Sequence, residues 1–153
     1  MPNTYTQIYL QFVFAVKYRA CVIQPSWKNN LYQYITGIVQ NNGHKMLVIN
    51  GMPDHLHIFI GMMPNQSISD LLKDVKRSSS IWINENKFVK GKFEWQEGYG
   101  AFSYAKSQIK NVIAYIENQE EHHKSESFKK EYIQFLQKFE IAYDEKYIFK
   151  DLI

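Results

Sequence analysis

Two histidines separated by a single leucine, His55 and His57, lie in the apolar stretch PDHLHIFIG. Alternate side chains of a strand share one face of its sheet, so both imidazoles would point the same way. A buried imidazole without a polar partner costs free energy, and two neighbouring imidazoles can meet this need by binding one shared metal ion. Two separately hydrogen-bonded histidines beside a turn remain the alternative.

A tyrosine and a glutamine one helical turn apart, Tyr115 and Gln119, follow in the segment SQIKNVIAYIENQEEHHK. The apolar residues of this segment recur at helical spacing at Ile109, Val112, Ile113 and Ile116. Tyr115 would lie about 110° around the helix from the centre of that stripe, on the same flank as Gln119. Side chains at positions i and i+4 are neighbours, so the hydroxyl and the amide would be presented together. An ordinary half-exposed tyrosine is the alternative for this position.

The elements that must position these residues follow from periodicity and turn signals. Alternation and β-branched residues predict strands over 4–16, 45–50, 55–62 and 93–105, the last interrupted near Gly98 and Gly100. Helical spacing predicts helices over 24–43, 67–86, Ser107–His123 and Ser127–Phe139, followed by a polar and aromatic tail over 144–153. Turn residues 51–54 join two of the strands as a hairpin. The order β-α-β-β-α-β followed by two helices predicts an α+β fold of the ferredoxin-like type (split βαβ, RRM-like), an antiparallel sheet with helices on one face plus C-terminal helices.

Composition favours a single globular domain over residues 1–153, with 45% hydrophobic and 22% charged residues. No apolar run approaches the roughly 20 residues of a membrane span and no signal peptide is visible, so we expect a cytoplasmic protein without membrane association. Cys21 is the only cysteine, so a metal would need histidine, carboxylate or amide ligands. The net charge of +3 is compatible with a nucleic-acid partner.

Taken together, these motifs resemble those of a known family. The strand motif PDHLH, the helix motif YIENQ, the run Trp95–Tyr99 and the serines Ser78–Ser80 are similar to those of the HUH-superfamily single-tyrosine transposases of the smallest bacterial insertion sequences. The resemblance covers essentially the whole chain. It implies a DNA transposase that cleaves and rejoins single-stranded DNA at hairpin-bearing element ends through a 5′-phosphotyrosine intermediate.

The resemblance also assigns roles to residues. It implies that His55, His57 and Gln119 hold a divalent metal, Mg²⁺ or Mn²⁺, and that Tyr115 is the nucleophile. Imidazole ligands alone favour zinc, copper or nickel, so the choice of metal rests on the resemblance. One histidine pair and one tyrosine per chain serve one DNA end, so we expect a homodimer. In the resembling family the tyrosine helix can serve the histidines of the other subunit.

Two groups of residues are candidates for DNA contact. Lys73, Lys76 and Arg77 cluster opposite the apolar residues of the helix predicted over 67–86, where they could face a phosphate backbone. The run Lys17, Tyr18 and Arg19 follows the first strand and offers two charges and a ring for stacking. A plain solvated surface is the alternative for both groups.

Two other functions remain open from the sequence. A non-catalytic nucleic-acid-binding module of the RNA-recognition type shares the same element order, but its aromatic RNP1-type pattern is not found and the histidines would be unexplained. A relative that uses the same nuclease chemistry in plasmid replication or repair would usually carry additional domains.

Overall fold

The computed structural model describes residues 3–124 and 127–144 of the chain. Four strands form one antiparallel sheet in the order β2-β3-β1-β4, and their bounds are β1 Tyr9–Ala15, β2 Lys45–Met52, β3 His55–Gly61 and β4 Gly100–Tyr104. The element order and the β2–β3 hairpin are those predicted, so the α+β, ferredoxin-like class is confirmed.

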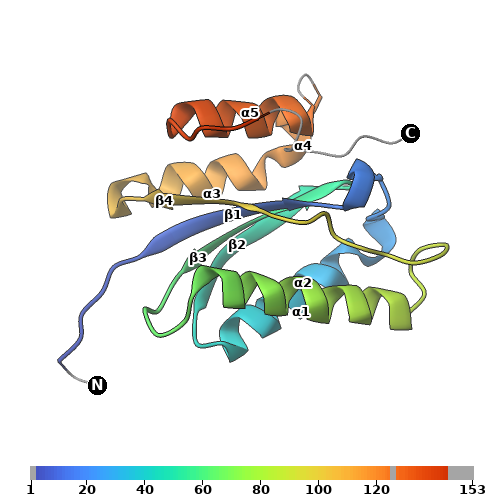
Figure 1. Cartoon of the computed structure of the whole chain (residues 1–153), viewed down its shortest axis with the longest axis horizontal. Helices are drawn as coiled ribbons and strands as arrows, with labels where there is room; N and C mark the ends of the chain where they lie inside the picture. Colours follow the sequence, from blue (N-terminus) through green and yellow to red (C-terminus); the bar gives the residue numbers. More distant parts are fainter. Residues whose placement is uncertain (1–2, 125–126, 145–153) are drawn as a thin grey trace.

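Helices cover both faces of this sheet (Figure 1). One face carries α1 (Pro25–Asn41) and α2 (Ile68–Glu85). The other face carries α3 (Ile109–Glu117), α4 (Gln119–His122) and α5 (Phe128–Lys138). Short 3-10 turns at Lys17–Arg19 and Lys106–Gln108 follow β1 and precede α3. The predicted C-terminal helices therefore form the second cover of the sheet.

The face toward α1 and α2 is an apolar core. Leu56, Ile58 and Ile60 of β3 point into it and are fully buried. They pack against one buried stripe from each helix, Trp27, Leu31, Ile35 and Val39 from α1 and Leu71, Leu72, Val75 and Ile83 from α2. Complete burial of such a side chain contributes about 1.5–3 kcal/mol, so this face supplies most of the hydrophobic stabilisation.

The face toward α3, α4 and α5 carries two smaller apolar clusters. One joins Phe59 of β3 to Val112 and Ile116 of α3. The other joins β1 and β4 to α5 through Val13, Ala15, Phe102, Phe128, Phe135 and Leu136. The close approach of α5 requires glycine at the start of β4, because a Cβ atom at Gly100 would lie 2.7 Å from the ring of Tyr132. Polar side chains described below fill the space between the two clusters.

Two predicted strands are shorter in the structure. Of the strand predicted over 4–16, only β1, Tyr9–Ala15, pairs as a strand of the sheet. The strand predicted over 93–105 is reduced to β4, with an isolated bridge between Val16 and Trp95. Gly98 has a φ of +85°, in the left-handed region that favours glycine, and produces the predicted interruption.

The single helix predicted over Ser107–His123 is wrong, because the structure breaks it at Asn118. Asn50 of β2 donates from Nδ2 to the carbonyl oxygens of Ile116 and Glu117, at 3.0 and 3.2 Å. These contacts satisfy carbonyl groups at the end of α3, where a side chain can replace the next turn of helix. The last helix is confirmed to within one residue at each end, and the predicted tail lies, beyond Asp144, outside the described residues.

Within residues 3–124 and 127–144, no helix has both the length and the apolar character that a membrane crossing requires.

Candidate metal and tyrosine site

The β2–β3 hairpin positions both histidines. His55 and His57 are fully buried and stand opposite Ala15 and Val13 of β1. The hairpin turn is held by backbone hydrogen bonds, since the Val16 amide donates to the carbonyl oxygen of Asp54 at 2.8 Å. Both imidazoles point toward the α3–α5 side, as the strand alternation predicts.

The break after α3 places Tyr115 and Gln119 beside the histidines. Gln119 is fully buried at the first position of α4, and its Oε1 lies 3.2 Å from His55 Nε2. The Tyr115 ring lies edge-on to the His57 ring, with 6.1 Å between ring centroids. The predicted side-by-side presentation of the hydroxyl and the amide is therefore confirmed, although a helix break and not a continuous helix produces it.

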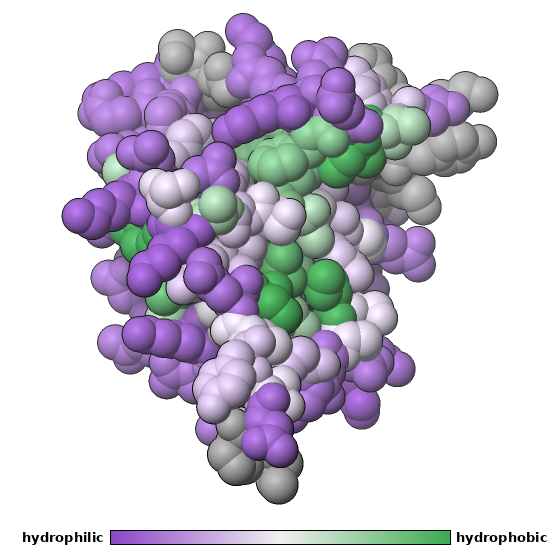
Figure 2. All heavy atoms as spheres, turned by 90° about the vertical axis from the view of Figure 1, so that its left-hand side faces the viewer, coloured by the Kyte–Doolittle hydropathy of each residue, from purple (hydrophilic) through white to green (hydrophobic). Residues whose placement is uncertain are grey.

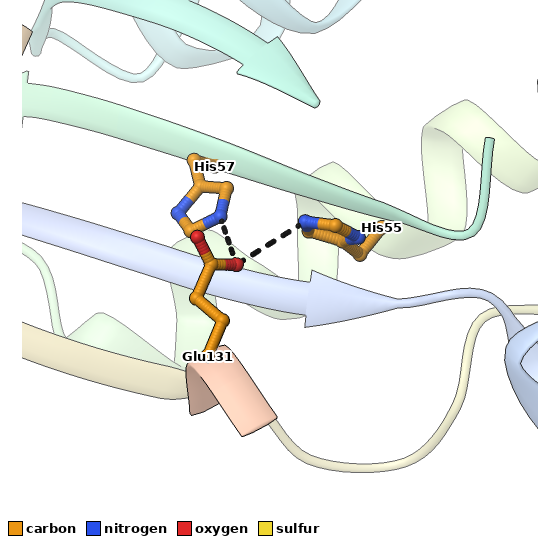
Figure 3. A group of neighbouring side chains, drawn as sticks. All are labelled: His55, His57 and Glu131. Atoms are coloured by element: carbon orange, nitrogen blue, oxygen red, sulfur yellow. Dashed lines mark hydrogen bonds and ion pairs between the residues drawn. The ribbon is translucent and has the colours of Figure 1, made fainter. Parts of the chain in front are cut away.

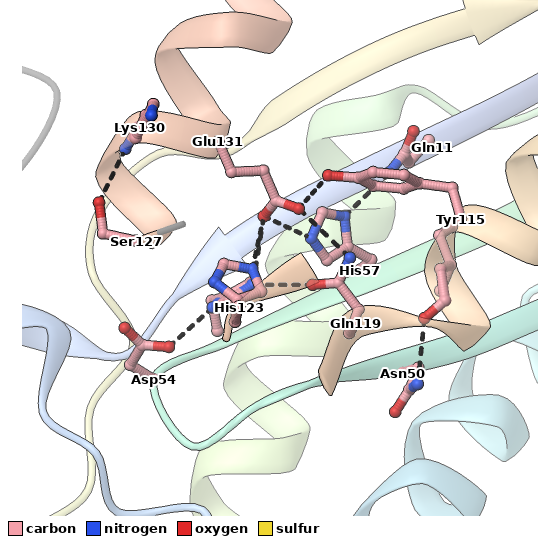
Figure 4. A network of polar contacts seen from close by, with 12 residues as sticks. Gln11, Asn50, Asp54, His57, Tyr115, Gln119, His123, Ser127, Lys130 and Glu131 are labelled. Atoms are coloured by element: carbon pink, nitrogen blue, oxygen red, sulfur yellow. Dashed lines mark hydrogen bonds and ion pairs between the residues drawn. The ribbon is translucent and has the colours of Figure 1, made fainter. Parts of the chain in front are cut away.

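A fifth residue, Glu131 of α5, occupies the centre of the group (Figures 3 and 4). Its Oε1 lies 3.0 Å from His57 Nε2 and 3.4 Å from His55 Nε2. Its Oε2 accepts hydrogen bonds from the Tyr115 hydroxyl and from Gln119 Nε2, the latter at 3.2 Å. One buried carboxylate thus contacts every residue that the sequence predicts for the site.

Glu131 was missed by sequence reasoning, although a signal exists. It lies three residues after Phe128 and four before Phe135, both buried, and is therefore on the apolar stripe of α5. A carboxylate on a buried stripe needs cationic or hydrogen-bonding partners. His123 supplies one more such contact, with its Nε2 3.2 Å from Glu131 Oε1.

The electrostatics of the site follow from this burial. Burial acts to raise the pKa of the Glu131 carboxyl, but hydrogen bonds from His123, His55 and His57 outweigh it and hold that pKa well below its ordinary range. Burial also acts to lower the pKa of His55, yet the carboxylates of Asp54 and Glu131 outweigh it and raise that pKa. The pKa of His57 is lowered, because there burial exceeds the attraction of Glu131. The carboxylates of Asp54 and Glu131 thus favour the charged form of His55, whereas burial favours the neutral form of His57.

The donor set fits a divalent cation. Ligand atoms of His55, His57 and Glu131 lie within 4.8 Å of one another, and the amide oxygen of Gln119 is adjacent. The buried carboxylate of Glu131, next to His55 and His57, can offset the positive charge of such an ion. Carboxylate and amide oxygens added to two imidazoles also move the donor set toward Mg²⁺ and Mn²⁺, which the histidines alone would not favour.

A cavity of about 370 Å³ reaches the Tyr115 hydroxyl side of this group. It is lined at its outer end by Gln108, Asn111 and Lys138, where α3 begins and α5 ends. Figure 2 shows the molecule from that side, with apolar side chains reaching the surface between hydrophilic ones. Tyr115 and Glu131 also line this cavity, so it connects the buried group with the surface.

The candidate DNA-contact residues are divided between two places. Lys17, Tyr18 and Arg19 follow β1 at the end of the sheet where His55 lies, with Lys17 paired to Glu94 at 3.2 Å. Both Tyr18 and Arg19 have positive φ, at 60° and 54°.

The residues on α2 lie across the sheet from the histidines. Lys73 and Arg77 are exposed, whereas Lys76 is half-buried and donates from Nζ to the carbonyl oxygens of Gln96, at 2.8 Å, and Gly98. Burial lowers the pKa of Lys76 to about 8. The structure therefore does not bring this group to the histidine cluster.

These features define a class of protein: a ferredoxin-like α+β domain whose sheet carries a buried histidine pair facing a tyrosine and a glutamine. The family described as "Transposase IS200 like" matches residues 4–119, three quarters of the chain. The chain belongs to this family of transposases. Glu131 and all of α5 lie beyond the matched residues.

The chain is also similar to one curated relative and to two solved structures. The chain is similar to the ISDra2 transposase TnpA of Deinococcus radiodurans, with 25% identity over 118 residues that cover 74% of this chain and 84% of the relative. A crystal structure from D. radiodurans R1, assigned as a transposase, shares the fold with a TM-score of 0.63 and 24% identity, covering 76% of this chain and 94% of that one. A REP-associated tyrosine transposase bound to a REP hairpin shares it with a TM-score of 0.61 and 12% identity, over 79% of this chain and 72% of that one.

Proposed function

We propose that this transposase cleaves and rejoins single-stranded DNA at hairpin-bearing element ends, with Tyr115 as the nucleophile. The observation that carries the proposal is convergence. The Tyr115 hydroxyl and the Gln119 amide reach the same buried carboxylate as His55 and His57, although the two pairs lie on elements that are distant along the sequence. A purely structural role would not require a reactive hydroxyl beside two buried imidazoles.

The chemistry at Tyr115 is a transesterification. Attack of the tyrosine oxygen on the scissile phosphorus forms the oxygen–phosphorus bond of a 5′-phosphotyrosine and breaks the bond to the 3′-oxygen. The proton lost from the phenol balances the one gained by the leaving 3′-oxygen, which becomes a hydroxyl. A second 3′-hydroxyl can reverse the step and join new strands. Glu131 has a depressed pKa and is a weak base, so its hydrogen bond orients the tyrosine instead of retaining the proton.

We propose that His55 and His57 hold a divalent metal, Mg²⁺ or Mn²⁺, with Gln119 and Glu131 as oxygen donors. When bound there, such an ion supplies positive charge that polarises the phosphate and favours the phenolate. The protein residues keep that charge next to the Tyr115 hydroxyl and away from bulk water.

DNA contact is proposed at both candidate groups. Lys17, Tyr18 and Arg19 follow β1 at the end of the sheet where His55 lies, and there they would contact the single strand. Lys73 and Arg77 would contact phosphates of a hairpin on the far face, while Lys76 steadies the loop at 96–98. The hairpin bound by the REP-associated transposase supports a hairpin substrate for this fold.

We further propose that the chain acts in the cytoplasm as one domain, over residues 1–153, and as a homodimer. Two element ends must be cut, and each chain supplies one tyrosine at one histidine pair. The contact between Tyr115 and His57 within one chain supports sites that are built in cis. Mixing His57→Ala chains with Tyr115→Phe chains should then restore no cleavage. A measured mass equal to that of one chain, at the concentration used for cleavage, would contradict the homodimer.

Mass spectrometry of the protein after incubation with single-stranded hairpin DNA and Mn²⁺ tests the central proposal. The wild type should gain the mass of one cleaved strand, and Tyr115→Phe should gain none while still binding the hairpin. Tyr99→Phe, at another partly exposed tyrosine, is the matched control and should form the adduct. An adduct in Tyr115→Phe would exclude Tyr115 as nucleophile, and hairpin binding without any wild-type adduct would favour the non-catalytic module.

A further inference from the structure

Gln11 of β1 is a fully buried amide that contacts His57 on the side away from Glu131. Its Nε2 lies 2.9 Å from His57 Nδ1, and its Oε1 accepts a hydrogen bond from the Tyr104 hydroxyl at 2.8 Å. The chain Tyr104–Gln11–His57–Glu131 thus crosses the polar layer from β4 to α5. Figure 4 shows the part of it from Gln11 to Glu131. Neither Gln11 nor Tyr104 takes part in the chemistry proposed above.

The hydrogen bonds of this chain specify where His57 carries its proton. An amide nitrogen only donates, so His57 Nδ1 must accept from Gln11. A neutral imidazole then holds its single proton on Nε2, which donates to Glu131 Oε1 at 3.0 Å. Every polar group in the chain is satisfied in this arrangement, and Nε2 has no lone pair for a metal.

A metal ligand at Nε2 requires the opposite tautomer, with the proton on Nδ1. A rotation of the Gln11 amide group by about 180° supports that tautomer, because it exchanges the positions of Oε1 and Nε2 and leaves the rest of the side chain in place. Oε1 would accept from Nδ1–H, and Nε2 would donate to the Tyr104 oxygen, which both accepts and donates. Burial raises the pKa of Tyr104 to about 12, so its hydroxyl keeps its proton at neutral pH.

His55 has no such freedom. Its Nδ1 lies 2.7 Å from Asp54 Oδ1, and an ionised carboxylate only accepts, so Nδ1 always carries a proton. The two histidines of the pair therefore differ: Asp54 fixes one ring for ligation through Nε2, whereas Gln11 serves the other ring in either tautomer.

We propose that Gln11, backed by Tyr104, is a positioning residue that lets His57 exchange between a tautomer bonded to Glu131 and a tautomer that ligates the metal. The inference rests on the proposed metal site and adds the change in His57 that lets this site bind the metal. His57 stays neutral in both states, so the exchange moves a proton between ring nitrogens and needs no change of net charge.

Nitrogen-15 NMR of the histidine rings tests the exchange in the wild-type protein, without DNA. His57 should be protonated on Nε2 in metal-free protein and on Nδ1 at saturating Mg²⁺, while His55 keeps a protonated Nδ1 throughout. The same His57 tautomer in both samples would overturn the proposal, and this measurement needs no variant to fold.

Mn²⁺ affinity of the free protein, measured by electron paramagnetic resonance, gives a second readout. Gln11→Met leaves Nδ1–H without an acceptor and should weaken Mn²⁺ binding by about 10- to 100-fold. Tyr104→Phe should weaken it by less, because only the outer end of the chain is lost. Gln134→Met, which changes an amide of the same cavity that does not touch His57, is the control and should bind as the wild type does.

The outcomes separate this inference from the proposed function. Wild-type affinity in Gln11→Met, with Mn²⁺ bound by the wild type, would overturn the role of Gln11 and leave the metal site standing. Absence of Mn²⁺ binding in the wild type would overturn the metal site itself, and the inference with it.

Discussion

The two faces of strand β3 are equally buried and yet chemically opposite. Leu56, Ile58 and Ile60 enter an apolar core under α1 and α2. His55 and His57, which alternate with them, enter a layer of amides, a tyrosine and a carboxylate under α3, α4 and α5. One seven-residue strand therefore faces both the apolar core and a buried polar layer.

The contrast between the two faces separates the residues that stabilise the fold from the residues that we propose for function. Apolar burial gains free energy at each residue, whereas a buried ion pair must first offset its own desolvation and often adds little net stability. Apolar residues of the same volume could fill the polar layer at least as stably. The presence there of a buried carboxylate, three histidines and a tyrosine hydroxyl therefore indicates function, and the two faces should respond differently to mutation.

Ile58→Ala should give the largest loss of stability. Truncating this fully buried side chain removes transfer free energy and leaves a cavity, so the free energy of unfolding should fall by about 2–5 kcal/mol in urea denaturation. Ile81→Ala, at a position that is 46% exposed, should stay within about 0.5 kcal/mol of the wild type. A loss below about 1 kcal/mol at Ile58 would mean that this face is not the main source of stability.

On the opposite face, His57→Ala should mainly change activity. Metal-dependent cleavage should fall by about 100-fold or more, because one protein ligand is deleted, while the free energy of unfolding changes less than in Ile58→Ala. His44→Ala is the matched control: His44 is also buried, but it bonds to Gln66 and to the Met63 amide and should affect stability alone. Unchanged cleavage by His57→Ala across a Mg²⁺ and Mn²⁺ titration would contradict the metal site.

The sequence predicts the apolar face better than the polar one, for a physical reason. Period-2 and period-3.6 patterns record which side of each element is buried, and they locate β3, α1, α2 and α5 with only small errors at their ends. The same alternation correctly assigns His55 and His57 to one side of the sheet. Local pattern is sufficient wherever burial alone decides the structure.

What the sequence leaves undetermined depends on contacts between distant elements. The break before Gln119 depends on Asn50, 66 positions before Ile116, and no local propensity predicts it. Glu131 becomes the centre of the site only when α5 packs over β1 and β4. Gln11 is one polar residue in an apolar strand, and its significance follows only from its position opposite His57.

Lys76 gives a pH test of the apolar side, where a charged group is an exception. Its pKa is lowered from 10.5 to about 8 by burial, so between these values the unfolded chain holds a proton that the folded chain has lost. Stability should therefore rise with pH across this window, by about 1–2 kcal/mol after allowance for partial solvent screening.

Lys76→Met should remove that rise, as seen in urea denaturation at pH 8 and pH 10. Glu97 opposes the shift, and the buried tyrosines Tyr32, Tyr104 and Tyr132, with pKa values raised to about 12, act in both proteins and cancel in the comparison. Lys73→Met, on the exposed face of the same helix, controls for the loss of one positive charge. Parallel profiles of the wild type and Lys76→Met would contradict the buried ammonium.

The smallest expected effect compares matched helix caps on the two faces. Ser67 accepts a hydrogen bond from the Asp70 amide at the start of α2, and Ser127 accepts one from the Lys130 amide at the start of α5, at 3.0 and 3.2 Å. Replacing either serine by alanine should lower the free energy of unfolding by about 1 kcal/mol.

The effects of the two replacements on metal binding should differ, because Glu131 lies in the first turn of α5. Ser127→Ala should also weaken Mn²⁺ binding by a few-fold, since fraying of that turn loosens the carboxylate, whereas Ser67→Ala should leave Mn²⁺ affinity unchanged. Equal Mn²⁺ affinity in both variants, with equal losses of stability, would show that Glu131 is held by the packing of Phe128 and Phe135 alone.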